Sequence, residues 1–223
     1  MLLRERFPSP RERKNRAVFM DRDGVIIKEV NYLSRLEDMK IISGVADSIA
    51  KLRKAGFKMI VISNQSAVAR GRLSLFKLHK ITRVLLQMIR EKNSKACIDA
   101  VYYCPHHPDF GKPCSCRKPG IGLLLKAQKK FNIDLKSSYF VGDSSADILT
   151  ARRAGCVPLL VKTGKGGKDG LYKAKPKKIF KNLSEASRWI LTAQVRHSGE
   201  SRNPVGNLDP DFRRGDVSSC AGF

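Results

Sequence analysis

The stretch Ala17-Val-Phe-Met-Asp-Arg-Asp-Gly24 carries four apolar residues that run directly into two aspartates and a glycine. The apolar run predicts a buried strand over residues 17–20, and Gly24 indicates the turn that follows it. Asp21 and Asp23 therefore stand just past the carboxyl end of a strand. Open parallel sheets bind their ligands at this end of the strands, so the two carboxylates are candidate site residues.

Similar apolar stretches recur along the chain and alternate with helical patterns. We expect further strands at residues 58–62, 100–103, 138–141 and 157–161, and helices at 44–55, 74–92, 120–131, 146–154 and 183–191. Polar residues again follow the strand ends, with Ser63 and Asn64 after one strand and Asp143 after another. This alternation predicts an α/β fold with a doubly wound parallel sheet.

Composition bounds the organisation of the 223-residue chain. No stretch approaches the roughly 18 consecutive apolar residues of a membrane span, and the sequence opens without a signal-peptide pattern. We therefore expect a cytoplasmic protein with reduced thiols and, by default, a monomer. We expect a basic arm at residues 1–15, one catalytic domain at 16–192, and a disordered tail at 193–223, where the apolar periodicity stops.

Much of the formal net charge of +24 lies in two basic runs. Residues 4–16 hold six basic residues against two acidic ones, and residues 162–181 hold eight lysines against Asp169. Such surfaces attract polyanions, including nucleic acids and phosphorylated sugars. Tyr172 is nearly alone as a stacking aromatic in the second run, so nucleic acid is not favoured and a solvated surface is the simpler interpretation.

The predicted strand ends together supply the groups that phosphoryl transfer requires. Asp21 and Asp23 share one side of an extended segment, and Asp143 could join them around a hard cation such as Mg²⁺. One carboxylate can accept a phosphoryl group and another can protonate the leaving oxygen. Ser63 and Lys118 can donate to the phosphoryl oxygens.

In order and spacing these residues resemble the haloacid dehalogenase superfamily of phosphatases. Its four motifs match Asp21-x-Asp23-Gly24, Ser63, Lys118 and Gly142-Asp143-x-x-x-Asp147. The resemblance implies a Rossmann-like fold, a nucleophile in Asp21, a general acid and base in Asp23, and phosphate anchors in Ser63 and Lys118. It also implies Mg²⁺ held by Asp21, Asp143 and the backbone carbonyl of Asp23. We expect Asp147 to support the site or its helix terminus rather than to bind metal, and no insertion is large enough for a cap domain.

A second cluster lies between Cys104 and Cys116, where three cysteines and two histidines occur within thirteen residues. Cys104, His106, Cys114 and Cys116 form a closed tetrahedral set that suits a structural Zn²⁺. His107 competes with His106, which is favoured because alternation points Cys104 and His106 the same way. A redox-active cysteine pair is the alternative, but the neighbouring histidines favour metal. We therefore predict a zinc-binding loop whose four protein ligands leave no position open to activate water.

The sequence of this loop resembles that of one branch of the superfamily, the heptose bisphosphate phosphatases. The same resemblance is found in a second stretch, Asn64-Gln-Ser-Ala-Val-Ala-Arg-Gly71. The resemblance implies removal of the 7-phosphate from D-glycero-D-manno-heptose 1,7-bisphosphate. It further implies that Asn64, Arg117 and Lys118 contact the substrate and that Arg70 meets its distal phosphate, unless Arg70 is a solvated loop residue. Ala67 and Val68 depart from the motif, and Ser144 stands where these enzymes often have lysine.

Other functions stay open on the sequence alone. The related histidinol-phosphate phosphatases carry a similar zinc loop, and the basic charge would suit a phosphatase of nucleic-acid ends. A non-enzymatic basic binding module is least favoured, because such a module has no chemical need for both Asp21 and Asp23.

Overall fold

The computed structural model describes residues 14–30, 33, 35–111 and 113–198, with side chains described up to residue 193 in the last helix. The strands are β1 (Arg16–Met20), β2 (Phe57–Asn64), β3 (Ala100–Cys104), β4 (Tyr139–Gly142), β5 (Val157–Val161) and β6 (Lys178–Phe180). The α-helices are α1 (Val45–Lys54), α2 (Ser66–Ala69), α3 (Leu75–Lys92), α4 (Gly122–Phe131), α5 (Ser145–Ala154) and α6 (Leu183–Ser198). Two 3-10 helices cover Leu36–Asp38 and Pro108–Phe110.

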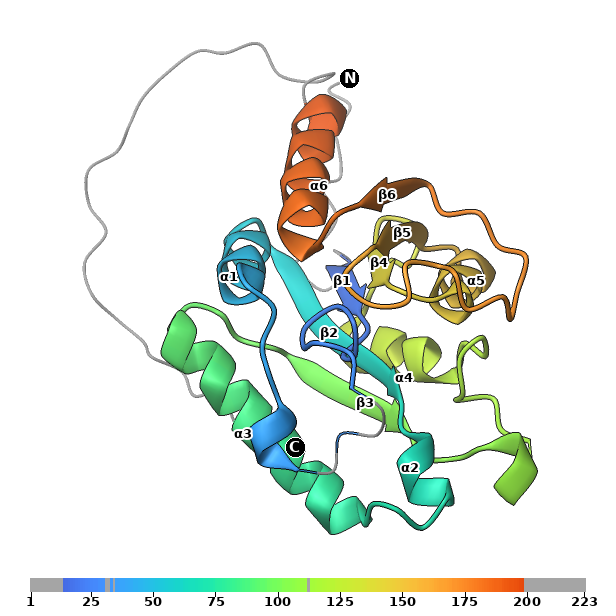
Figure 1. Ribbon diagram of the computed structural model, residues 1–223. Helices are drawn as coiled ribbons and strands as arrows, with labels where there is room; N and C mark the ends of the chain where they lie inside the picture. The colour runs from blue at the N-terminus through green and yellow to red at the C-terminus, as the bar shows by residue number, and fades with distance from the viewer. Residues whose placement is uncertain (1–13, 31–32, 34, 112, 199–223) are drawn as a thin grey trace, which may run out of the picture.

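The strands form one parallel sheet in the order β3-β2-β1-β4-β5-β6 (Figure 1). The strand β1 is paired on both sides, with Met20 opposite Val61 of β2 and Val141 of β4. Residues that follow these three positions therefore emerge together at one edge of the sheet. The backbone N–H of Asp21 continues the pairing by donating to the carbonyl of Val141 at 3.0 Å.

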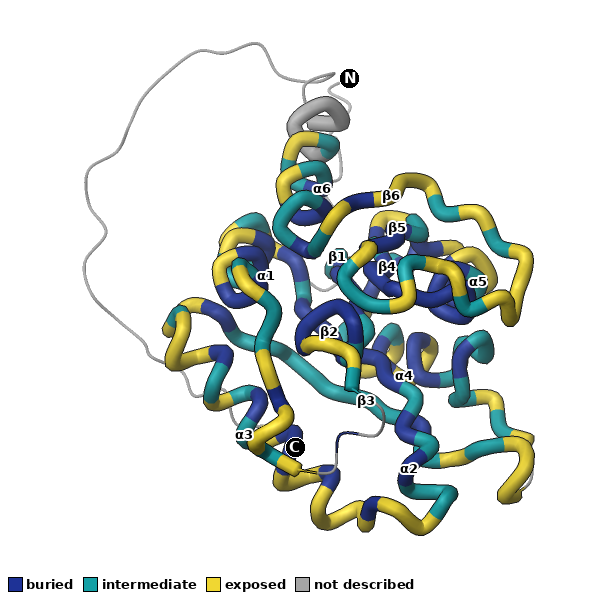
Figure 2. Tube along the Cα trace, viewed as in Figure 1, coloured by how far each residue is buried: buried dark blue, intermediate teal, exposed yellow. Residues whose placement is uncertain are grey.

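Two apolar cores lie on opposite faces of the sheet because successive strand residues point to opposite sides. On β1, Val18 and Met20 pack into the core shared with α1, α3 and α6, whereas Ala17 and Phe19 pack into the core shared with α4 and α5. Figure 1 shows these two helix groups on either side of the strands. In Figure 2, buried and exposed residues alternate along α1 and α3, as expected for helices with one face against a core.

The structure confirms the predicted α/β class and each of the expected strands and helices to within a few residues at most ends. Three α-helical and strand features differ from the expectation: α2 and β6 were not foreseen, and α6 continues to Ser198, beyond the boundary expected at residue 192. The strand β6 lies at the sheet edge inside the lysine-rich run, and only Phe180 of its three residues is buried. Most of the predicted arm (1–13) and tail (199–223) lies outside the described residues.

None of the described helices combines the length and the apolar character that crossing a lipid bilayer requires.

Replacement of Phe19 by alanine tests the packing of the central strand. The Phe19 ring is fully buried and stacks on Phe140 with 6.3 Å between ring centroids, so Phe19→Ala should lower the free energy of unfolding by about 3–5 kcal/mol. Phe76→Ala is the matched control because that ring is 78% exposed, and its effect should stay within about 0.5 kcal/mol. Urea denaturation measures both, and equal losses would contradict the assigned core.

Candidate active site

A cavity of about 290 Å³ opens at the carboxyl edge of the sheet. Six of the eight residues predicted to act in catalysis, in substrate binding or as magnesium ligands line it: Asp21, Asp23, Asn64, Arg117, Lys118 and Asp143. These residues come from β1, β2, the loop after β3 and the turn after β4, and the parallel sheet brings them to one place. Ser63 lies in the same region, buried at the end of β2, where its hydroxyl contacts Gln65.

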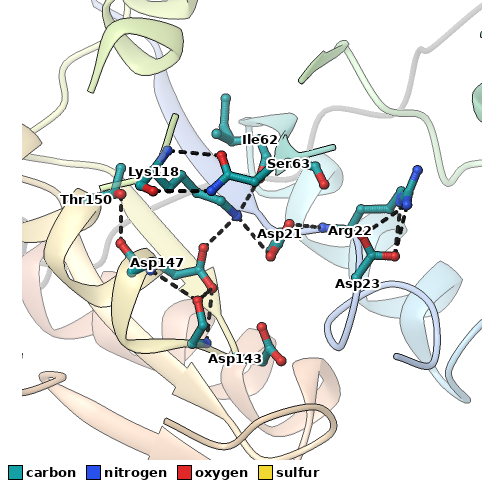
Figure 3. Close-up of polar contacts among 12 residues, drawn as sticks. Asp21, Arg22, Asp23, Ile62, Ser63, Lys118, Asp143, Asp147 and Thr150 are labelled. Carbon is teal, nitrogen blue, oxygen red and sulfur yellow. Dashed lines mark hydrogen bonds and ion pairs between the residues drawn. The ribbon is translucent and has the colours of Figure 1, made fainter. Parts of the chain in front are cut away.

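Lys118 lies at the centre of the polar contacts (Figure 3). Its Nζ lies 2.9 Å from Asp21 Oδ2 and 2.6 Å from Asp147 Oδ1, and it donates to the carbonyl of Ile62 at 3.0 Å. Asn64 fixes the lysine backbone by accepting from its N–H at 3.0 Å and donating to its carbonyl at 3.2 Å. Burial alone lowers the pKa of Lys118, but the two carboxylates outweigh burial and raise it, so the side chain stays a cation.

Three carboxylates lie close to one another near the Lys118 ammonium group. Oxygens of Asp21, Asp143 and Asp147 lie within 4.8 Å of one another. Burial raises the pKa of Asp21 to about 8; Lys118 opposes this rise, and the neighbouring carboxylates add to it. Burial, with Asp147 beside it, also raises the pKa of Asp143 to about 7. An oxygen-rich set with excess negative charge fits a hard divalent cation such as Mg²⁺.

The close approach of the turn at residue 24 to the Asp143 carboxylate requires a glycine. Gly24 has a φ of +76°, and a Cβ placed on it would lie 2.4 Å from Asp143 Oδ2. The same oxygen accepts the backbone N–H of Lys165 at 2.7 Å. Any side chain at position 24 would therefore displace the Asp143 carboxylate from the edge of the cavity.

Asp147 supports the lysine and its own helix. While Oδ1 pairs with Lys118, Oδ2 accepts from the backbone N–H of Ser144 at 3.1 Å and from its hydroxyl at 2.6 Å. The two residues form a capping box at the start of α5. Asp147 lies within metal-binding reach of Asp21 and Asp143, but both of its oxygens already have partners.

Asp23 is held by two residues that the sequence reasoning did not single out, Arg22 and Gln65. The Arg22 guanidinium donates to both Asp23 oxygens at 3.0–3.2 Å, and the Gln65 amide donates to Asp23 Oδ2 at 3.1 Å. Arg22 and Gln65 are themselves buried. Their only sequence signal was position: one lies between the two motif aspartates and the other directly after Asn64.

The predicted zinc ligands converge on one point at the end of β3. The sulfur atoms of Cys104, Cys114 and Cys116 lie 3.1–3.5 Å apart. His106 Nδ1 lies 3.4 Å from the Cys116 sulfur and 3.6 Å from that of Cys104. Tetrahedral zinc with bonds of about 2.3 Å to sulfur places its sulfurs about 3.7 Å apart, so the four residues fit this metal with small adjustments. Burial by itself raises the pKa of Cys114, but hydrogen bonds from the other two thiols lower it to about 6.

Arg117 and Arg70 occupy different places. Arg117 lines the cavity and donates to the carbonyl of His106 at 2.9 Å, which ties it to the cysteine-rich loop. Arg70 is not among the cavity-lining residues; it lies against that loop, with its Nη2 3.3 Å from His107 Nε2 and its guanidinium 4.8 Å from the centre of the Phe110 ring. His107 therefore contacts Arg70, while His106 joins the cysteines.

The loop after β5 forms a further wall of the cavity through Lys165, Asp169, Leu171 and Tyr172. Asp169 anchors this wall by accepting from the backbone N–H of Ser145 at 2.9 Å and from its hydroxyl at 2.8 Å. These residues fall within the run that the sequence reasoning interpreted as solvated basic surface. No periodic pattern or motif in the run indicates that the loop turns back over α5.

Comparisons with known proteins agree with this geometry. Residues 115–186 match the family model of HAD-hydrolase-like proteins. The D-glycero-D-manno-heptose-1,7-bisphosphate 7-phosphatase of Thermosynechococcus vestitus is 38% identical over 191 residues, which cover 79% of this chain and 95% of the relative. The D-glycero-alpha-D-manno-heptose-1,7-bisphosphate 7-phosphatase of Photorhabdus laumondii is 42% identical over 158 residues, or 68% of this chain and 85% of the relative.

A solved structure extends the comparison to three dimensions. The D,D-heptose 1,7-bisphosphate phosphatase of B. bronchiseptica, complexed with magnesium and phosphate, matches with a TM-score of 0.71 at 29% identity. The match covers 80% of this chain and 99% of that one.

The raised pKa of Asp143 predicts a pH dependence of stability in magnesium-free buffer. With a pKa of about 7 in the folded protein and an ordinary value in the unfolded chain, Asp143 binds a proton on folding between about pH 4 and 7, so stability falls as pH rises. Relative to Asp143→Asn, the wild type should lose about 2 kcal/mol of unfolding free energy from pH 5 to pH 8. Urea denaturation at both pH values measures this, and a pH-independent difference would contradict the assignment.

Proposed function

The chain belongs to the D-glycero-D-manno-heptose 1,7-bisphosphate phosphatase family of haloacid dehalogenase-like hydrolases, and we propose that it has the corresponding activity. In this proposal it is a magnesium-dependent phosphatase that removes the 7-phosphate from that heptose bisphosphate. One observation supports assigning the activity of the family to this chain. Asp21, Asp23, Lys118 and Asp143, which are distant in sequence, line a single cavity at the sheet edge. A family member without catalytic function would have no reason to keep this arrangement of charges.

In the proposed reaction, a carboxylate oxygen of Asp21 attacks phosphorus and the bond from phosphorus to the sugar oxygen breaks. Asp23 gives a proton to that leaving oxygen. Water then attacks the aspartyl phosphate, Asp23 takes a proton from it, and phosphate and free Asp21 are regenerated. The Lys118 ammonium, 2.9 Å from Asp21 Oδ2, is placed to hold the nucleophile and to stabilise charge on the phosphoryl oxygens.

A divalent cation fits the carboxylates of Asp21 and Asp143, which lie close together and both line the cavity. Asp21, Asp143 and the backbone carbonyl of Asp23 would hold Mg²⁺, and the bound cation would supply positive charge for the phosphoryl group. Asp147 stays with Lys118 and Ser144 in this assignment.

The cysteine-rich loop has a structural task in the proposal. Zn²⁺ held by Cys104, His106, Cys114 and Cys116 would fix the loop that delivers Arg117 and Lys118 to the cavity. Arg117 and Asn64 would then contact the substrate, while Arg70 would support the loop rather than meet a distal phosphate.

A panel of phosphoesters tests the function. With Mg²⁺, the protein should release phosphate from D-glycero-D-manno-heptose 1,7-bisphosphate with a kcat/KM at least tenfold above that for histidinol phosphate or a 5′-phosphorylated oligonucleotide. Asp21→Asn should lower the rate by at least about 10³-fold, because an amide is a poor nucleophile. Asp47→Asn is the control, since Asp47 is exposed on α1. Equal weak rates on all compounds, or full activity of Asp21→Asn, would contradict the proposal.

Metal analysis tests the zinc loop. We expect about one Zn²⁺ per chain in protein purified without chelators. His106→Ala should lose the zinc and lower the melting temperature, whereas the neighbouring His107→Ala should keep it, because His107 contacts Arg70 rather than the cysteines. Zinc retained by His106→Ala and lost from His107→Ala would show that the ligand was misassigned.

A further inference from the structure

We propose that Arg22 and Gln65 are positioning residues that together orient the Asp23 carboxylate and the Ser63 hydroxyl for catalysis. The inference rests on the proposed phosphatase function, in which Asp23 exchanges protons with the leaving oxygen and with water. Neither side chain touches the phosphoryl group in this assignment; each acts through a neighbour.

Arg22 lines the cavity beside Asp23 and holds its carboxylate. Its Nε and Nη2 donate to Asp23 Oδ1 at 3.2 and 3.0 Å, and Nη2 also lies 3.0 Å from Oδ2. The Arg22 backbone is fixed as well, because its carbonyl accepts the N–H groups of Ile26 and Ile27. The guanidinium group therefore has little freedom, and neither does the carboxylate paired with it.

Gln65 has a partner for each of its polar functions. Its amide nitrogen donates to Asp23 Oδ2 at 3.1 Å and to Ser63 Oγ at 2.9 Å, while its amide oxygen accepts from Arg22 Nη2 at 3.0 Å. These partners specify which end of the amide faces which neighbour. Gln65, which also lines the cavity, thereby links the ends of β1 and β2.

The same contacts set the direction of the Ser63 hydroxyl. Because Ser63 Oγ accepts from Gln65, its own hydrogen is left to be donated to another group. A phosphoryl oxygen above Asp21 is such an acceptor in the proposed reaction. Gln65 thus orients both Asp23, the carboxylate that transfers the proton, and Ser63, whose hydroxyl donates to the phosphate.

The burial of Arg22 indicates that its contacts with Asp23 and Gln65 serve to position the Asp23 carboxylate rather than to stabilise the fold. The Arg22 side chain is only 4% exposed, and removing a guanidinium group from water costs several kcal/mol that one ion pair barely offsets. Among the described residues, Asp23 is the acidic residue that pairs with Arg22. An apolar side chain would fill the same space at lower cost, but it would leave Asp23 free to rotate.

Substrates that differ in their leaving group test the inference. In Arg22→Met and Gln65→Met, kcat/KM for D-glycero-D-manno-heptose 1,7-bisphosphate should fall at least tenfold more than kcat/KM for p-nitrophenyl phosphate, because an alkoxide needs a proton to leave and p-nitrophenolate does not. Using kcat/KM confines the comparison to the step in which the leaving group departs. Gln65→Met should also show a smaller loss common to both substrates, through Ser63.

Thr82→Val is the matched control because it deletes a buried hydrogen bond, from Thr82 Oγ1 to the Leu78 carbonyl, within α3 and away from the cavity. It should leave the ratio of the two kcat/KM values unchanged. If Arg22→Met does not fold, Gln65→Met decides alone. An unchanged ratio in a folded, active Gln65→Met enzyme overturns the positioning role and leaves the phosphatase intact, whereas a wild type inactive on both phosphoesters overturns the proposed function itself.

Discussion

The buried ammonium group of Lys118 joins three parts of the fold at one atom. Its partners are Asp21 after β1, the Ile62 carbonyl in β2 and Asp147 in α5, at 2.6–3.0 Å. Without this cation, two closely spaced carboxylates would lie in a region largely closed to water, which is among the costliest arrangements a protein can adopt. The cavity, the orientation of Asp21 and the start of α5 therefore depend on a single lysine, which itself comes from the end of the cysteine-rich loop.

Lys118 connects two clusters of different chemistry that could each hold a metal ion. The thiolate and imidazole cluster can stabilise the loop that carries Lys118, and Asn64 fixes the lysine backbone from the other side. The lysine balances part of the negative charge of Asp21, Asp143 and Asp147, and the remainder suits a divalent cation. In the proposed function, zinc at the cysteine cluster would order the loop, and a divalent cation at the carboxylates would supply positive charge for the phosphoryl group.

The sequence predicted the sheet and most of the cavity because both follow from local patterns. Apolar runs that stop at polar residues located Asp21, Ser63 and Asp143, and clustering located the four candidate zinc ligands. Arg22 and Gln65 were missed because their role depends on pairing across two strands, which no local pattern encodes. The wall from Lys165 to Tyr172 was missed for a related reason: its glycines and lysines are typical of solvated loops, and only hydrogen bonds to Asp143 and Ser145 reveal its position. A motif also predicts Arg70 at the substrate; in the structure Arg70 ends α2 and contacts His107 of the cysteine-rich loop.

If Asp21, held by Lys118, is the nucleophile, it becomes covalently phosphorylated during turnover. Enzyme quenched in acid during turnover and reduced with borohydride can test it, since an acyl phosphate is reduced to an alcohol whereas a free carboxylate is not. Peptide mass spectrometry should find homoserine at position 21, and only in samples that contained substrate. Homoserine at position 23 or 143, or none anywhere in an enzyme turning over at full rate, would show that Asp21 is not the nucleophile.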